Sequence, residues 1–198
     1  MAKRSGRWQL PGSVQDRQSI TAEWRYVEEE RIEGVELFEM KSVITHNGHL
    51  TEIYRADWKL DEAGVEQVFQ RVLEPAGLSA WHVHEFTRDR LFVASGALRI
   101  VLYDARPDST TFGRINEFRI GSVRPALLTI PPKVWHGVEN LSCERALLLN
   151  LVDRAYRYEK PDHYRLPADS DQIPYRFRGA GSIDAPPRAS TGVPLGSR

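Results

Sequence analysis

The stretch Gly77-Leu-Ser-Ala-Trp-His-Val-His-Glu-Phe-Thr-Arg-Asp89 indicates the fold of this chain more strongly than any other. Its two histidines, His82 and His84, are separated by a single residue. Successive side chains of a β-strand point to opposite faces, so residues i and i+2 share a face. If the stretch forms a strand, both imidazoles enter one cavity, and Asp89 follows after a short loop.

A second polar group occurs later, in Pro131-Pro-Lys-Val-Trp-His136-Gly-Val-Glu-Asn140. The proline pair predicts a turn, which places the third histidine near the start of another strand. Two histidines from one strand, a carboxylate and a third histidine supply nitrogen and oxygen donors that suit Fe, Mn, Ni or Zn. The residues of this possible metal site are His82, His84, Asp89 and His136.

Short strand patterns dominate the middle of the chain. Runs of β-branched, aromatic and aliphatic residues are separated by turn signals such as Asn47-Gly48 and Ser95-Gly96. The expected strands are 35–43, 50–56, 90–95, 97–104, 115–120, 126–130 and 145–152, and helices are predicted only at 19–31 and 61–72. Many short strands with few helices favour an all-β antiparallel sandwich or barrel.

Composition limits the class of protein. The chain has 198 residues, 27 Lys+Arg against 27 Asp+Glu, and one cysteine, Cys143. Zero net charge argues against nucleic acid or an anionic membrane as partner, and no apolar run is long enough to span a bilayer. A lone cysteine and the lack of an apolar leader fit a reducing, cytoplasmic setting. We therefore expect a cytoplasmic protein with a small-molecule partner.

The two ends differ from the middle. Residues 1–18 are polar and lack a sustained period, so we expect a flexible N-terminus. Residues 179–198 are rich in Gly and Pro and cannot bury enough apolar surface to offset their ordering entropy. The sequence therefore predicts one folded domain, 19–178, followed by a flexible tail.

The two histidine motifs resemble those of the cupin superfamily. The first cupin motif runs from Gly through His-x-His and Glu to a second Gly, and the second runs from Pro-x-Gly to His and Asn. This chain has Asp for Glu in the first motif and Lys for Gly in the second. The resemblance implies a double-stranded β-helix, or jelly-roll barrel, with a few short helices and the histidines inside. The matching positions are Gly77, His82, His84, Asp89, Gly96, Pro131, Lys133, His136 and Asn140.

A closer resemblance, over about 31–177, is to the dTDP-4-dehydrorhamnose 3,5-epimerase family. His46-Asn-Gly-His-Leu-Thr-Glu52-Ile-Tyr-Arg55 resembles the family's Asp-x-Arg-Gly-x-Phe-x-Glu-x-Phe-Arg. Leu102-Tyr-Asp-Ala-Arg-Pro-Asp-Ser-Thr-Thr-Phe-Gly113 resembles its Val-Asp-x-Arg-x-x-Ser-Pro-Thr-Phe-Gly, and Pro131 to Leu141 resembles Pro-x-x-x-Ala-His-Gly-Phe-x-x-Leu. The resemblance implies an isomerase of nucleotide-linked 4-keto sugars in carbohydrate biosynthesis, needing no cofactor and acting as a homodimer.

The same resemblance implies roles for single residues. His82 would be the base that removes the proton next to the keto group, since a neutral imidazole accepts protons near neutral pH. Tyr156 matches a tyrosine near the sugar, and the two form the expected catalytic pair. Further substrate-binding positions are Glu52, Arg90, His84, His136 and Asn150.

Several positions depart from the family pattern. Asn47 and Ser79 replace arginines that grip the diphosphate, and Asn150 stands where a proton-donating tyrosine is expected. We find no match in 178–198 for the aspartate that orients the histidine. His84 stands where these epimerases usually carry Gln, which favours a metal.

Two alternatives to the epimerase interpretation therefore remain. One is a metal-dependent cupin, such as a small-molecule oxygenase or isomerase, with a divalent transition metal on the four residues named above. The other is a non-catalytic cupin that binds a sugar. The remaining histidines, His46, His49 and His163, lie in turn or loop contexts, and we expect them to face solvent.

Overall fold

The computed structural model describes residues 8, 10–16, 18–24, 27, 30–60 and 62–177. The chain forms two compact units, Met1–Glu30 and Arg31–Arg198. In the first unit the backbone turns at Trp24, whose N–H donates to the carbonyl of Thr21. The described residues within 19–31 contain no helix, so the helix expected there is not found in them. The tail predicted at 179–198 lies outside the described residues, and the flexibility of 1–18 stays a prediction.

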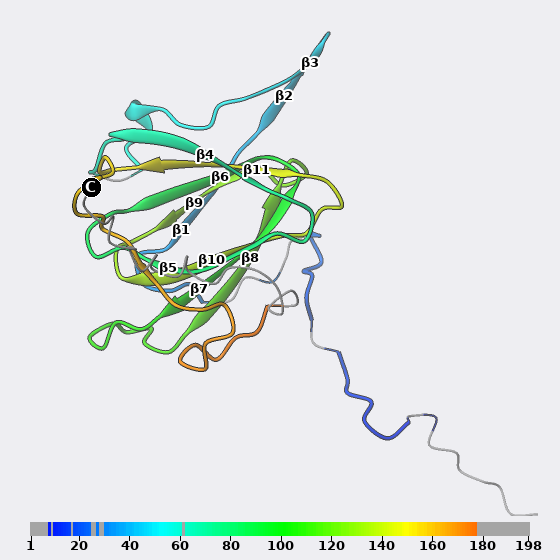
Figure 1. Ribbon diagram of the computed structural model, residues 1–198. Coiled ribbons are helices and arrows are strands. Elements are labelled where there is room, and N and C mark those ends of the chain that lie inside the picture. The colour runs from blue at the N-terminus through cyan, green and yellow to red at the C-terminus, as the bar shows by residue number, and fades with distance from the viewer. Residues whose placement is uncertain are drawn as a thin grey trace, which may run out of the picture. The chain divides into compact units, whose positions relative to one another are not determined.

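The second unit consists of two five-stranded antiparallel sheets that pack face to face (Figure 1). One sheet has the order β1 (Glu36–Glu39), β9 (Ala126–Ile130), β6 (Asp89–Ser95), β11 (Ala146–Val152) and β4 (Gln67–Leu73). The other has the order β12 (Tyr164–Arg165), β5 (Leu78–Val83), β10 (Val134–Asn140), β7 (Ala97–Asp104) and β8 (Ile115–Gly121). From β4 to β7 the chain crosses between the sheets at every step, and the predicted jelly-roll fold is confirmed.

The core lies between the two sheets. Leu98, Ile100 and Leu102 of β7 point inward and are fully buried, as their alternation along the strand predicts. Each such side chain contributes roughly 1.5–3 kcal/mol through its removal from water. On β10, Val134 and Val138 belong to the same core. His136, which lies midway between them on the strand, therefore also faces the interior.

The helix predicted at 61–72 is wrong, because this segment supplies β4. Val65, Val68, Phe69 and Val72 recur at spacings that also suit a helix. In the structure, residues 67–73 pair instead with β11 along its whole length. The apolar spacing of this segment fits both a helix and a strand, and pairing with the neighbouring strand β11 selects the strand. The one helical element among the described residues is the 3₁₀ turn η1 (Ala56–Trp58).

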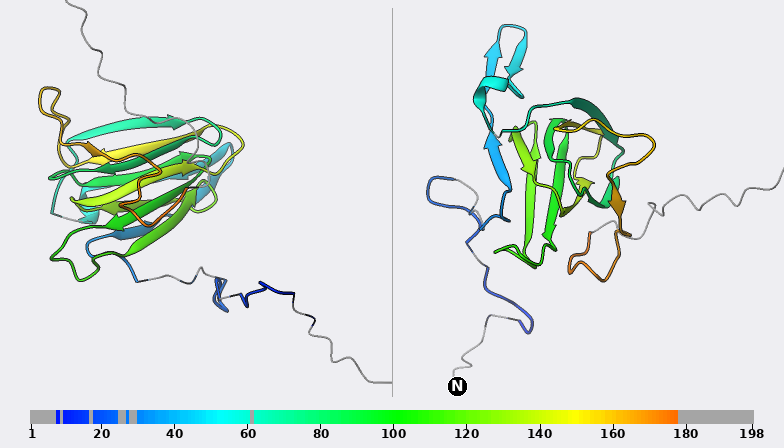
Figure 2. Two further views of the ribbon diagram at one scale, coloured as in Figure 1. Left: turned by 60° about the horizontal axis from the view of Figure 1, so that its bottom comes forward. Right: turned by 90° about the vertical axis from the view of Figure 1, so that its left-hand side faces the viewer.

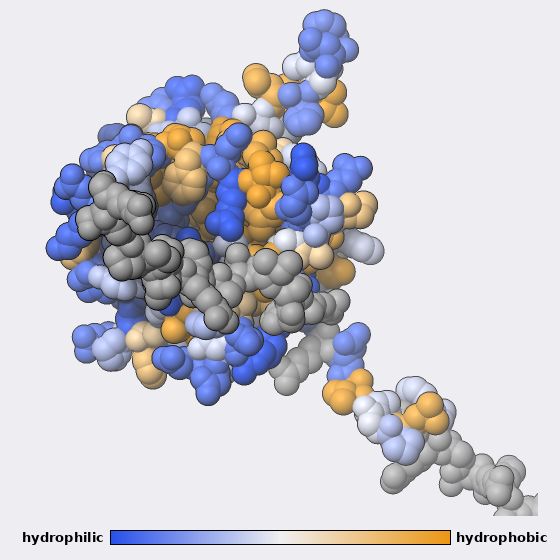
Figure 3. All heavy atoms as spheres, in the orientation of Figure 1, coloured by the Kyte–Doolittle hydropathy of each residue, from blue (hydrophilic) through white to orange (hydrophobic). Residues whose placement is uncertain are grey.

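A two-stranded hairpin, β2 (Ser42–Thr45) and β3 (Gly48–Thr51), projects from the barrel (Figure 2). Three of its apolar side chains are largely exposed: Val43, Ile44 and Leu50. Figure 3 shows apolar residues on this projection. In the described part of the chain, no helix has the length and apolar character needed to cross a bilayer.

Candidate functional site

Four imidazole rings gather inside the barrel. β5 carries His82, and His84 follows directly after its last residue. β10 places His136 opposite His82 in the antiparallel register, and His163 comes from the segment just before β12. The ring centroids of the contacting pairs lie 4.9 to 5.9 Å apart. The predicted convergence of the first three histidines is therefore present, and a fourth joins them.

His163 is the histidine that sequence reasoning missed. It was expected to face solvent, yet it is partly buried, and its Nε2 lies 2.9 Å from Nδ1 of His82. The other nitrogen of His82, Nε2, lies 2.6 Å from the Ser79 hydroxyl. Both nitrogens of His82 thus have a polar partner, and the partner of Nδ1 is an imidazole.

The environment of His82 disfavours its charged form. Its pKa is lowered to about 2, first by burial, then by His136 and His163 and by the charges of Arg165 and Arg71. The pKa of His163 is lowered to about 4, again mainly by burial. At neutral pH both rings are therefore uncharged, and each presents a lone pair that accepts a hydrogen bond.

Asp89 lies deep in the same interior, with an exposed fraction of 2 %. Its Oδ1 accepts a hydrogen bond of 2.7 Å from the side-chain amide of Asn150. Its Oδ2 lies 3.5 Å from Nε2 of His84 and 3.7 Å from Nε2 of His136. Asn150 is held in turn by the Arg90 backbone N–H, which donates to its side-chain oxygen. Asn150 therefore faces the interior, where it positions Asp89.

Asp162 holds His84 in place. Its backbone carbonyl oxygen accepts a hydrogen bond from Nδ1 of His84. Its carboxylate accepts hydrogen bonds from the backbone N–H groups of Glu85, Phe86 and Thr87. Burial opposes ionisation of this carboxyl, but these hydrogen bonds hold its pKa below the usual range. The segment before β12 is thereby tied to the loop between β5 and β6.

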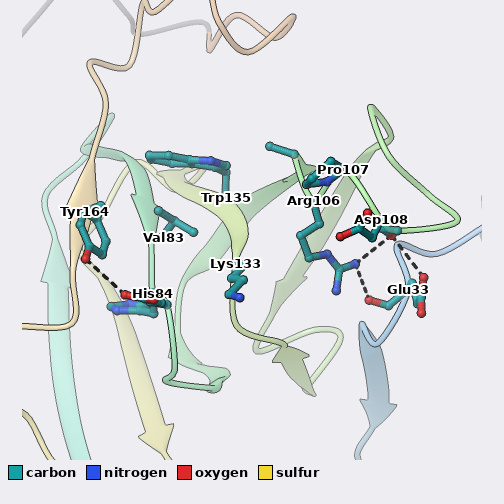
Figure 4. A pocket seen from close by; sticks show the side chains of 12 residues that line it. Glu33, Val83, His84, Arg106, Pro107, Asp108, Lys133, Trp135 and Tyr164 are labelled. Atoms are coloured by element: carbon teal, nitrogen blue, oxygen red, sulfur yellow. Dashed lines mark hydrogen bonds between the residues drawn. The ribbon is translucent and has the colours of Figure 1, made fainter.

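A hollow of about 770 Å³ opens beside His84 (Figure 4). Trp135 and Lys133 line its middle, between His84 on one side and Arg106 on the other. Lys133 has a φ of 66°, in the left-handed region that favours glycine, and its N–H donates to the His84 carbonyl. The volume lies within the usual range for small-ligand sites, and His84 links the hollow to the histidine cluster.

Comparison with known proteins identifies the family of this barrel. Residues 29–182 match the model of the family described as dTDP-4-dehydrorhamnose 3,5-epimerase. The chain belongs to this family. The predictions of an isomerase and of the epimerase lineage are thereby confirmed, and among the functions left open above the family favours the epimerase.

Two curated relatives and one solved structure illustrate the similarity. A probable low-salt glycan biosynthesis epimerase, Agl13 of Haloferax volcanii, is 35% identical over 70% of this chain and 89% of its own. The spore coat polysaccharide biosynthesis protein SpsL of Bacillus subtilis is 30% identical over 74% and 96%. A dTDP sugar isomerase from Desulfovibrio desulfuricans G20 has 29% identity and a TM-score of 0.69, covering 77% of this chain and 94% of its own.

Three residues that the family pattern assigned to the site lie apart from the histidines. Arg90 is fully buried, and its guanidinium donates to backbone carbonyls, among them that of Ala63 at 2.8 Å. Glu52 follows the projecting hairpin and pairs with Arg55 at 3.2 Å. Tyr156 is 48 % exposed, and its ring meets Tyr158 edge-on. The roles of Arg90, Glu52 and Tyr156 toward a substrate stay predictions.

Proposed function

We propose that this member of the epimerase family inverts a carbon next to the keto group of a nucleotide-linked 4-keto sugar, for glycan biosynthesis. The main support for this proposal is the family match over residues 29–182, together with the position of His82 at the centre of a buried polar cluster. A base removes the proton on the carbon beside the carbonyl, and the electron pair moves onto oxygen as an enolate. A proton returned to the opposite face inverts the carbon, so the atoms balance without a cofactor.

His82 is the proposed base. His163 engages its Nδ1, so Nε2, which faces the Ser79 hydroxyl, is the nitrogen that accepts the substrate proton. A pKa of about 2 makes the isolated ring a weak base. A sugar linked to a diphosphate brings negative charge that raises this pKa, because an anion stabilises the imidazolium. Binding of the substrate thus makes His82 a stronger base.

The hollow beside His84 is the proposed seat of the nucleotide part. Of its basic side chains, Arg106 is tied to Asp104 at 2.8 Å, whereas no ion pair of Lys133 is found within the described ranges. The Lys133 ammonium therefore suits a diphosphate, in place of the arginines that the family carries at Asn47 and Ser79. Trp135 offers a ring on which a base or a sugar can stack.

The proposed enzyme is a cytoplasmic homodimer. The hairpin β2–β3 exposes Val43, Ile44 and Leu50, and an isolated two-stranded hairpin is only marginally stable in water. Packing against a second copy of the chain would cover these side chains. The free, exposed Cys143 fits a reducing compartment. Replacing Ile44 with Asp is expected to shift the mass in solution from two chains to one, as measured by analytical ultracentrifugation; a monomeric wild type would refute the dimer.

The reaction is tested by deuterium uptake. Purified protein is mixed with a dTDP-4-keto-6-deoxy sugar in heavy water, and incorporation beside the carbonyl is followed by NMR. We expect uptake in the wild type and a loss of at least about 100-fold in His82→Gln, the usual scale of general base catalysis. His49→Gln, at an exposed histidine of the hairpin, is the matched control. No uptake by folded wild type, or equal uptake by both variants, would refute the proposal for this substrate class.

A further inference from the structure

We propose that His84, Asp89 and His136 form a binding site for a divalent transition metal ion. One donor atom from each residue, Nε2, Oδ2 and Nε2, lies within 4.8 Å of the other two. Two imidazole nitrogens and one carboxylate oxygen are a donor set that Fe²⁺, Mn²⁺, Co²⁺, Ni²⁺ and Zn²⁺ accept. The epimerisation proposed above uses no metal, so this site goes beyond that function.

The second polar atom of each residue is already held. Nδ1 of His84 contacts the Asp162 carbonyl oxygen, and Nδ1 of His136 lies 3.2 Å from the Val134 carbonyl oxygen. Oδ1 of Asp89 accepts the amide hydrogen bond of Asn150. In metal sites, such outer contacts orient the ligands and set the histidine tautomer. Here they leave the three remaining atoms, Nε2, Oδ2 and Nε2, close to one another.

These contacts also decide what the three atoms present to one another. A carbonyl oxygen only accepts hydrogen bonds, so the proton of each histidine sits on Nδ1. Nε2 of His84 and of His136 then carries a lone pair, and so does Oδ2 of Asp89. Three lone pairs this close together repel each other, and a proton or a metal cation placed among them removes the repulsion. The arrangement is therefore suited to bind a metal ion.

The charge of Asp89 supports the same conclusion. A carboxylate buried to this degree is costly unless a positive charge is close. Within the described residues, neither lysine nor arginine forms an ion pair with Asp89, whose side chain contacts Asn150 and the two histidines. A bound dication would supply the missing charge. When bound, such an ion acts as a Lewis acid that polarises an oxygen of a ligand.

His82 is not part of this set. Its Nε2 contacts Ser79 and its Nδ1 contacts His163, so the proposed base and the proposed ligands use different atoms. The four-ligand site expected from the sequence thereby becomes a three-ligand site next to His82. Failure of metal binding would leave the deuterium experiment unaffected, and the reverse also holds.

Metal binding by the intact protein is the test. The full chain is treated with a chelator and dialysed, then titrated separately with Co²⁺, Zn²⁺, Mn²⁺ and Ni²⁺ and followed by calorimetry, with elemental analysis for stoichiometry. We expect one equivalent of at least one ion per chain, and visible absorption bands when the ion is Co²⁺. Asp89→Asn and His84→Gln should each weaken binding by more than the about 10–100-fold that an outer contact contributes.

His46→Gln and His49→Gln are the controls, since both keep all three ligands and both lie in the exposed β2–β3 hairpin. We expect them to bind the metal within about threefold of the wild type, given that a threefold change is under 1 kcal/mol. Should Asp89→Asn not fold, His84→Gln decides, because His84 lies at the rim, where its side chain is 17% exposed. Wild type that binds less than stoichiometric metal, or a His84→Gln variant that binds as tightly as the wild type, would overturn the proposal.

Discussion

Two buried aspartates at strand ends, Asp104 and Asp89, show how differently one barrel treats the same side chain. Asp104 ends β7 and is fully buried, and its carboxylate accepts hydrogen bonds from Arg106, Ser109 and Thr111. Asp89 begins β6, and its partners are a neutral amide and two imidazoles. The negative charge of Asp104 is therefore balanced by the guanidinium of Arg106. Within the described residues, no arginine or lysine pairs with Asp89 in the same way.

The difference separates a structural carboxylate from a functional one. Arg106 also donates to the carbonyl of Glu33, so the Asp104 cluster ties the loop after β7 to the strand region before β1. Asp89 contacts Asn150 of β11, and its other oxygen faces the Nε2 atoms of His84 and His136, with no hydroxyl or guanidinium among these partners. A buried carboxylate without a paired cation lowers the stability of the fold, so the environment of Asp89 indicates a ligand-binding site.

The largest expected effect on stability is that of Asp104→Asn. Removing one partner of a buried ion pair leaves the other uncompensated, and Arg106 is only partly exposed. We expect the free energy of unfolding to fall by roughly 3 kcal/mol in urea denaturation. Asp108→Asn, at an exposed position of the same loop, should change it by less than about 0.5 kcal/mol. Equal losses in the two variants would abolish the distinction.

The second effect is a gain of stability that depends on metal. At a free ion concentration about one hundred times Kd, the wild type should gain about 2.7 kcal/mol of unfolding free energy. Asp89→Asn should gain little. With chelator present, Asp89→Asn should be at least as stable as the wild type, because its amide N–H donates to the Nε2 lone pairs. Urea denaturation with and without the ion measures both. A loss of several kcal/mol in chelated Asp89→Asn would make Asp89 structural like Asp104.

A smaller effect is expected for Asn150→Ala. The substitution removes the hydrogen bonds to Asp89 and to the Arg90 N–H, and a buried unpaired group costs about 1–3 kcal/mol. Metal affinity should fall by about 10–100-fold, the scale of an outer contact. Calorimetry and denaturation on one sample report both quantities. Unchanged metal affinity would show that Asn150 does not orient Asp89.

The smallest effect concerns pH. Hydrogen bonds from Arg106, Ser109 and Thr111 outweigh burial and hold the pKa of Asp104 below its usual range. A carboxyl with a depressed pKa in the folded state adds stability above its unfolded pKa of about 3.9, and that stability is lost as pH falls towards the folded value. Between pH 7 and 3 only the onset of this loss should be measurable. The free energy of unfolding should fall more steeply with decreasing pH in the wild type than in Asp104→Asn. Parallel curves would contradict this.

The strands of the core were predictable because their side chains alternate. Leu98, Ile100 and Leu102 fall on one face in the sequence and on one face in the structure. The i, i+2 spacing of His82 and His84 placed both imidazoles inside by the same rule. The segment 61–72 failed because its apolar spacing fits either a helix or a strand, and only the pairing of β4 with β11 decides between them.

The jelly roll, the family and three of the four interior histidines were predictable from the order of residues, because strand periodicity and motif spacing are local properties. The tertiary structure alone decided that His163 meets His82, that Asp162 holds His84, and that Asn150 turns Asp89 toward the other two ligands. These contacts join residues about 60 to 80 positions apart. His163 and Asp162 lie in the segment before β12, which has no periodicity, and Asn150 meets Asp89 through the pairing of β11 with β6, which no local pattern along the chain reveals.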